Sequence, residues 1–217
     1  MTEKKERRPP EEYSEVMRHL KPNGNPLGQF IPYPKGYGVE ILAKEEEMLL
    51  LVRKHWITNF KWVLVVIGLI LAGQLIPWFP FFNSLPAAFQ LMTTVFWYLI
   101  AVGVAMEGFF SWDFDVFVVT DERVIDIDFV NLIYKNITAA KIDKIEDVTY
   151  NVSGAVNSLL NFGTLLVQTA AEGMTVGPDG ARGTLEIINI PRPAMVAKLI
   201  NEMVLEEEQE QVEGRVR

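Results

Sequence analysis

Two long uncharged runs of apolar residues dominate the middle of the chain. The first extends from Trp62 to Ile76 and the second from Ala87 to Met106. Because an α-helix rises about 1.5 Å per residue, roughly 20 residues cross a hydrocarbon core about 30 Å thick. The second run has this length, and the first reaches it with its flank from Ile57. The pattern predicts a membrane hairpin with spans at about 57–76 and 86–107.

After residue 110 the pattern changes to short segments of β type. From Arg123 to Val130, apolar residues alternate with Asp126 and Asp128, which is typical of a half-buried antiparallel strand with a solvated acidic face. The helix expected from Pro193 carries one apolar stripe. We therefore predict a membrane α-helical hairpin followed by an all-β antiparallel domain that a C-terminal α-helix closes. The candidate strands are 115–120, 123–130, 132–137, 144–152 (or a helical turn at its start), 163–170, 184–190 and a short one at 174–176.

The two ends of the chain are less regular. The first 38 residues are dense in Pro and Gly, which favours a disordered leader; the alternative is one or two helical turns carrying Tyr13, Val16, Met17 and Leu20. Apolar and charged blocks then form a structured lead-in at the membrane surface. The predicted organisation is a leader at 1–38, the lead-in and hairpin at 39–110, the β domain at 111–205 and an acidic tail at 206–217.

Basic residues flank the outer ends of the two runs, whereas the connection between them is uncharged. By the positive-inside tendency, we expect both termini in the cytoplasm and the turn outside, in a multi-pass protein of the cell membrane. The same pattern predicts basic and aromatic side chains at the two membrane interfaces. These candidates are Arg53, Lys54, His55, Trp56, Trp62, Trp78, Phe79, Phe81 and Phe82.

Small residues four positions apart offer a close approach between the two spans. Gly68 and Ala72 form such a pair in the first span, and Ala101 and Ala105 in the second. Pairs of this kind suit tight helix packing in lipid. Chance occurrence is an equal alternative, and the same surfaces could instead join copies of the chain into an oligomer.

Charge and composition disfavour several classes of function. The net charge of −8 argues against nucleic-acid binding, which draws on cationic contacts to phosphate. The chain has no cysteine, and it lacks the motifs of nucleotide-binding loops, serine hydrolases and zinc proteases. We therefore predict a protein without catalytic residues, cofactors or metals. Asp126 and Asp128, with Asp113 or Asp115, could chelate calcium, but the solvated strand face is the favoured interpretation.

Four short segments stand out in the chain. They are VRKHWI at 52–57, VVTDERVI at 118–125, IDKIEDVTY at 142–150 and SLLNFGTLLVQTA at 158–170. Together with the hairpin and the closing helix, they resemble the bacterial pleckstrin-homology family in its membrane-bound form, over roughly residues 40–205. The resemblance implies a pleckstrin-like fold, a strongly bent, partly open antiparallel barrel plugged by the C-terminal helix. It supplies no catalytic residues, and the family's molecular role is mostly unassigned.

These features favour a membrane protein that displays a cytoplasmic domain as a protein-interaction or assembly module, with further copies of itself or other membrane proteins as partners. One alternative is a module that binds lipid or a small ligand through the loop at 177–183, with Lys144 and Arg182. A phosphoinositide headgroup is disfavoured, because residues 111–200 hold 12 acidic and 7 basic side chains. The other alternative is an accessory subunit of a transport or envelope-stress system.

Overall fold

The structure is a computed structural model of the whole chain, and it describes residues 9–22, 25, 27–34, 42, 46–129, 135–170 and 183–212. These residues form two compact units. We call Met1–His55, Asp115–Asp128 and Asn136–Arg217 the β unit, and Trp56–Phe114 with Phe129–Lys135 the helical unit. The helical hairpin is thus inserted between two strands of the β unit. The predicted order of a hairpin followed by a separate β domain is wrong in this respect.

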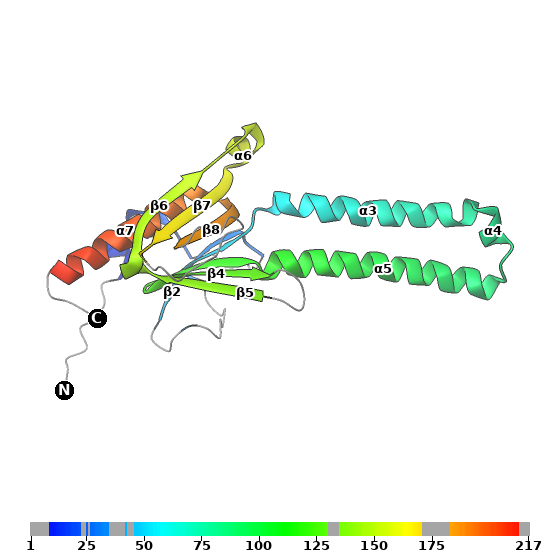
Figure 1. Cartoon of the computed structure of the whole chain (residues 1–217), viewed down its shortest axis with the longest axis horizontal. Coiled ribbons are helices and arrows are strands. Elements are labelled where there is room, and N and C mark those ends of the chain that lie inside the picture. Colours follow the sequence, from blue (N-terminus) through cyan, green and yellow to red (C-terminus); the bar gives the residue numbers. More distant parts are fainter. Residues whose placement is uncertain are drawn as a thin grey trace. The chain divides into compact units, whose positions relative to one another are not determined.

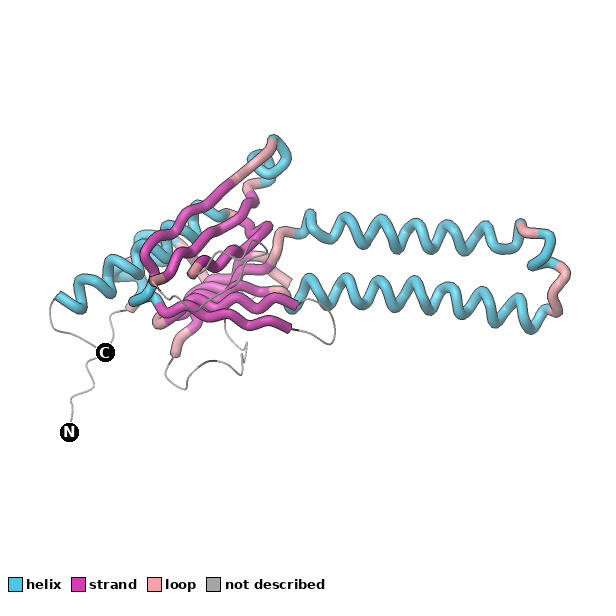
Figure 2. The backbone as a smooth tube through the Cα atoms, viewed as in Figure 1, coloured by secondary structure: helices cyan, strands magenta, loops and turns pink. Residues whose placement is uncertain are grey.

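The first sheet of the β unit has five strands in the order β1-β2-β3-β4-β5. Three of them, β2, β4 and β5, are labelled in Figure 1, and Figure 2 shows the strands in magenta. The strands are β1 (Phe30–Pro32), β2 (Met48–Arg53), β3 (Val116–Thr120), β4 (Arg123–Phe129) and β5 (Lys135–Lys141). Neighbours from β1 to β4 pair antiparallel. Since β2 and β3 are neighbours, the chain leaves and re-enters the β unit at adjoining strand ends.

The second sheet has three antiparallel strands in the order β6-β7-β8. Its strands are β6 (Ile145–Asn151), β7 (Phe162–Thr169) and β8 (Thr184–Pro191), and helix α6 (Ala155–Leu160) lies between the first two. A 3-10 helix at Ile142–Lys144 links β5 to β6, as the spacing of isoleucines allowed. β5 runs past its predicted end, and the predicted strand at 174–176 lies outside the described residues.

Helix α7 (Pro193–Val212) confirms the predicted C-terminal helix and packs against β6 and β7. Its buried apolar stripe belongs to the main core, which also takes in residues of both sheets. Burying such a stripe against the sheets is the main source of stability for a helix of this kind. The stripe consists of Val196, Leu199, Ile200 and Met203. The helix continues to Val212, so the first part of the predicted acidic tail is helical.

Described residues of the first 34 contribute to the core, and the prediction of a disordered leader is wrong for this described part. Helices α1 (Pro10–Tyr13) and α2 (Glu15–His19) precede β1. Ser14 caps α2, because its Oγ accepts a hydrogen bond from the Met17 N–H at 3.1 Å. Met17 is fully buried in the main core. The alternative of short helical turns is therefore the correct one.

The lead-in before the hairpin contains strand β2. The Thr-Asp-x-Arg segment at 120–123, in the β3–β4 turn, binds the side chain of Glu46, which precedes β2. Arg123 donates to Glu46 from Nε at 2.9 Å and from Nη2 at 2.7 Å. The Thr120 hydroxyl lies 2.6 Å from Glu46 and accepts from the Arg123 N–H at 3.0 Å. Because a side-chain hydroxyl stabilises the turn, the turn needs no glycine.

The helical unit consists of two long helices that run side by side and are joined through α4 (Figure 1). Both are long and apolar enough to cross a membrane. Their elements are a 3-10 helix at Trp56–Asn59, α3 (Phe60–Leu75), a 3-10 helix at Ile76–Trp78, α4 (Pro80–Asn83) and α5 (Ala87–Phe114).

The small residues at the contact between α3 and α5 differ from the predicted set. A Cβ on Gly73 would lie 2.9 Å from the Trp97 ring and 3.0 Å from the Tyr98 ring, whereas one on Gly68 would meet nothing within 4 Å. Gly68 therefore does not take part in the contact with α5, and the alternative that it joins copies of the chain stays a prediction. Ala101 is buried, and Ala72 and Ala105 are half-buried.

Candidate functional site: a buried charge cluster and a groove in the β unit

The β unit holds a row of charged side chains at the end where the chain passes into the helical hairpin. Lys54 follows β2, Asp115 precedes β3 and Asp128 lies near the end of β4. The strand register aligns these three positions across the sheet. The Lys54 ammonium forms ion pairs with Asp115 and, at 3.4 Å, with Asp128. The sequence did not reveal this row, since its members are far apart in the chain.

Asp126 lies on the same face of β4 as Asp128, and it is 5% exposed. Its register partner is Phe117 of the main core. The acidic face of β4 therefore points toward the main core, and the prediction of a solvated face is wrong for Asp126. The opposite face, with Ile125, packs in a second apolar cluster. Alternation predicted the strand, but it could not show that both faces are covered.

Burial controls the protonation of this cluster. Loss of solvent, reinforced by the carboxylates of Asp128 and Asp115, raises the pKa of Asp126 to about 7. Burial also raises the pKa of Asp115 to about 6, although the Lys54 ammonium acts in the opposite direction. Burial acts to lower the pKa of Lys54, but the neighbouring carboxylates outweigh it and raise that pKa. One ammonium thus serves three carboxylates, and the cluster can hold a proton near neutral pH.

The cluster offers no metal site. Among the described residues, no group of three or more His, Asp or Glu side chains is placed to hold a metal ion. The calcium alternative for Asp126 and Asp128 therefore has no support from the geometry.

Two of the basic residues predicted at the membrane interface turn their side chains into the β unit. Arg53 is 4% exposed and donates from Nη1 to the Gly28 carbonyl at 3.0 Å. The His55 ring stacks on Phe162 with 4.7 Å between ring centroids, and the His55 backbone N–H donates to the Asn189 carbonyl at 2.7 Å. Burial lowers the pKa of His55. These contacts fix the last residues of the β unit before the hairpin.

The aromatic candidates for the membrane interface are mostly open to the surroundings. Half or more of the side chain is exposed at Trp56, Trp78, Phe79 and Phe81. Phe82 differs, because it is buried at the turn of the hairpin. Trp62 is half-buried: its Nε1 donates to the Asn59 side chain at 3.1 Å, and its ring covers Gly108.

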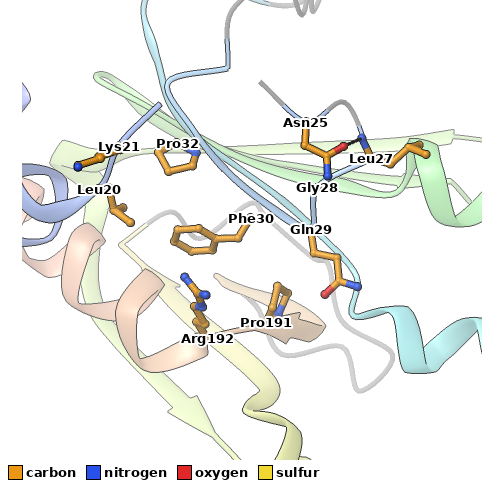
Figure 3. A pocket seen from close by; sticks show the side chains of 10 residues that line it. All are labelled: Leu20, Lys21, Asn25, Leu27, Gly28, Gln29, Phe30, Pro32, Pro191 and Arg192. Carbon is orange, nitrogen blue, oxygen red and sulfur yellow. Dashed lines mark hydrogen bonds between the residues drawn. The ribbon is translucent and has the colours of Figure 1, made fainter. Parts of the chain in front are cut away.

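A groove of about 500 Å³ lies in the β unit between the end of α2, β1 and the link from β8 to α7 (Figure 3). This volume falls within the range of small-molecule sites. The Arg192 guanidinium lies over the Phe30 ring, 5.3 Å from its centroid. The groove is lined by Leu20, Lys21, Asn25, Leu27, Gly28, Gln29, Phe30, Pro32, Pro191 and Arg192.

Arg192 has an unusual backbone for its position. Its φ is 51°, in the left-handed region, and its N–H donates to the Asn161 carbonyl at 2.9 Å. The side chain is exposed, and its guanidinium has no carboxylate partner in the described part of the chain. Sequence reasoning missed Arg192; its one signal was the pair of prolines on either side of it.

The residues predicted for a ligand loop do not meet at this groove. Lys144 is exposed and forms an ion pair with Asp143 at 3.4 Å. It is not among the residues that line the groove. Arg182 and the rest of 177–182 lie outside the described residues.

No protein-family model, curated protein or solved structure matches the chain. The fold therefore defines the class only coarsely: two long apolar helices inserted into a mostly antiparallel β unit with a C-terminal helix. The resemblance to the bacterial pleckstrin-homology family stays a prediction.

Proposed function

We propose that this chain is an integral membrane protein and that α3 and α5 cross the bilayer. The exposure of these apolar helices carries the proposal. Only Gly73 is buried among the 16 residues of α3, and only Ala101 among the 28 residues of α5. In a soluble protein, a core helix of this composition is covered by the rest of the chain. Lipid tails are the environment that can cover such helices on all sides.

Both termini lie in the cytoplasm in this proposal, and the β unit has a pleckstrin-like fold. The Lys and Arg residues outside the two spans support the orientation. The positive-inside tendency acts while the chain inserts, so the later ion pairs of Lys54 do not remove its contribution. Two mostly antiparallel sheets with a C-terminal helix support the fold that the family resemblance implies.

Extraction and labelling test the membrane proposal. The full chain should stay with the membrane pellet after alkaline extraction and should float with lipid vesicles. Since the chain has no cysteine, Asn83→Cys and Glu146→Cys give single labelling sites at the hairpin turn and on the exposed face of β6. An impermeant maleimide should reach Asn83→Cys only from outside the cell and Glu146→Cys only from inside. Recovery of the full chain in the soluble fraction without detergent would refute the proposal.

The proposed role of the β unit is that of a protein-interaction or assembly module. β6 ends the order of the three-stranded sheet, and Tyr150 on this strand is 48% exposed. Strands at the end of a sheet can accept a partner strand, which gives backbone affinity and side-chain specificity. Membrane anchoring raises the local concentration, so that weak contacts of this kind suffice for assembly.

Photo-cross-linking in native membranes tests this role. A benzoylphenylalanine in place of Tyr150 should give a specific adduct with a second copy or another membrane protein. The matched control carries the same group in place of Asn201, which is exposed on α7. If the chain stays monomeric with the probe at either position, at physiological expression, the β6 edge is not an assembly surface.

The groove at Arg192 favours a second candidate, the binding of a small anionic ligand. An exposed guanidinium without a carboxylate partner suits phosphate or carboxylate groups. Titration of the detergent-solubilised full chain with inorganic phosphate and with short-chain phosphatidic acid tests this function. Arg192→Gln should abolish binding, whereas Lys144→Gln should leave it unchanged. If neither probe binds, or if both variants behave alike, the groove does not serve this function.

A further inference from the structure

The tip of the β6–β7 hairpin is an exposed apolar surface. Residues 152–163 contain no charged side chain, although charged residues make up 22% of the whole chain. Helix α6 occupies this tip, and it leaves Val156 58% exposed and Leu159 85% exposed. Leu159 is more exposed than Trp78 at the turn of the helical hairpin, which is 82% exposed. Apolar side chains grouped in this way mark a binding surface.

The tip is held in a defined shape. Gly154 (φ 96°) and Asn161 (φ 52°) flank α6 with positive φ angles, and Asn161 is its left-handed C-cap. Gly163 allows the two strands to approach, because a Cβ there would collide with the Asn151 carbonyl. In Figure 1, α6 lies at the end of the β6–β7 hairpin, past the paired residues of both strands. The paired strands β6 and β7 therefore hold α6 in a defined position at the end of their hairpin.

A stacking contact ties the tip to the end of the β unit from which the chain enters α3. Leu159 lies three residues before Phe162, so their Cα atoms are at most about 11 Å apart. The Phe162 ring stacks on His55, and His55 directly precedes Trp56, where the first apolar helix begins. The region between the hydrocarbon core and bulk water is roughly 5–8 Å deep on each side of a bilayer. A tip tied to this end of the β unit can reach that region.

We propose that α6 inserts Val156 and Leu159 into the interfacial layer of the membrane that the hairpin spans, and that it fixes the pose of the β unit on this membrane. This inference rests on the proposed membrane function. The uncharged, Ser- and Asn-containing composition of 152–163 suits the headgroup region, where an apolar face is buried and polar groups stay hydrated. A contact that is weak alone is effective here, because the hairpin holds the tip near the lipid.

Spin-label depth measurements test the inference in the full chain, reconstituted into vesicles of phosphatidylcholine and phosphatidylglycerol. Ser158→Cys carries the nitroxide on α6 and keeps both apolar side chains. Leu71→Cys in α3 and Glu146→Cys on β6 serve as references for lipid and water. The measured quantity is the ratio of the nitroxide's accessibility to oxygen over its accessibility to a water-soluble nickel chelate. This ratio should be several-fold higher at Ser158→Cys than at Glu146→Cys. The double substitution Val156→Asp with Leu159→Asp should reduce the ratio at Ser158→Cys to the level found at Glu146→Cys.

The references separate the two hypotheses. If the Leu71→Cys label is open to the nickel chelate, the membrane proposal itself fails. If Leu71→Cys lies in lipid but Ser158→Cys behaves as Glu146→Cys does, the α6 inference is overturned and the membrane proposal stands. A Ser158→Cys label that is shielded from both reagents would show that protein rather than lipid covers the tip, and this result also overturns the inference.

Discussion

At the scale of single residues, Asp126 is a buried carboxylate of the β unit that has no ion pair of its own within the described residues. It is 5% exposed, and the ammonium of Lys54 is already paired with Asp115 and Asp128. A buried carboxylate without its own cation is costly when it is ionised, so the proton is retained to higher pH. Asp126 thus makes the stability of the folded chain dependent on pH.

The expected direction of this dependence follows from the two protonation states. The pKa of Asp126 is about 7 in the folded chain, and that of an unfolded aspartate is about 3.9. The folded state therefore binds more protons between pH 4 and pH 7, and the free energy of unfolding falls as the pH rises through this window. At pH 8, Asp126→Asn should stabilise the chain by roughly 2–4 kcal/mol, because a pKa difference of one unit corresponds to about 1.4 kcal/mol. At pH 4 it should have little effect.

Thermal unfolding of the detergent-solubilised full chain at pH 4, 6 and 8 checks this prediction. The control is Glu146→Gln, which removes an exposed carboxylate of β6. A weaker pH dependence should remain in Asp126→Asn, since burial also raises the pKa of Asp115 to about 6. An equal change in the unfolding temperature at all three pH values would show that the substitution acts through packing instead of charge.

At the scale of elements, sequence patterns found the two apolar helices, the strands after the hairpin and helix α7. Periodicity is a local property, and each of these elements carries it over enough residues. The patterns missed β1 and the role of β2, and they gave the helical turns of α2 only as the alternative to a disordered leader. These elements are short, and α2 and β1 are surrounded by Pro and Gly, while their burial depends on residues far away in the chain. Ser14 illustrates this, because its hydroxyl lies 2.5 Å from Glu202 of α7.

The candidate site was less predictable than the fold for the same reason. Lys54, Asp115 and Asp128 are neighbours only through the register of three strands, and the register is a tertiary property. Arg192 carries no motif that distinguishes it from other basic residues. By contrast, the Thr-Asp-x-Arg segment was visible in the sequence, because its turn contacts are local.

The contact between α3 and α5 gives a prediction about an element pair. Gly73→Leu should destabilise the hairpin by about 1–3 kcal/mol, the usual cost of overpacking, since the Cβ alone would lie 2.9 Å from the Trp97 ring. That ring has little room to move, because its Nε1 donates to the Leu69 carbonyl at 2.8 Å. Gly68→Leu makes the same chemical change where nothing lies within 4 Å. The unfolding temperature in detergent should fall for Gly73→Leu alone, and an equal fall in both variants would contradict this packing.

At the scale of the whole molecule, the hairpin is an insertion that the β unit does not need for its own core. β2 and β3 are antiparallel neighbours with Arg53 opposite Val116, so two residues are enough to join the strands directly. The apolar clusters of the β unit contain no residue from 56–114. We expect that replacing residues 55–114 by Asn-Gly, between Lys54 and Asp115, gives a β unit that folds in water without detergent.

This deletion separates the roles of the two units. The shortened chain should show a cooperative thermal transition and a β-rich circular dichroism spectrum, and it should no longer float with vesicles. It loses the stacking of His55 on Phe162, so its unfolding temperature should lie below that of a variant that retains His55 before the Asn-Gly turn. If both shortened chains aggregate, the β unit depends on the hairpin for folding, and the insertion is part of one cooperative structure. If both are soluble and still bind vesicles, the β unit carries a membrane contact of its own.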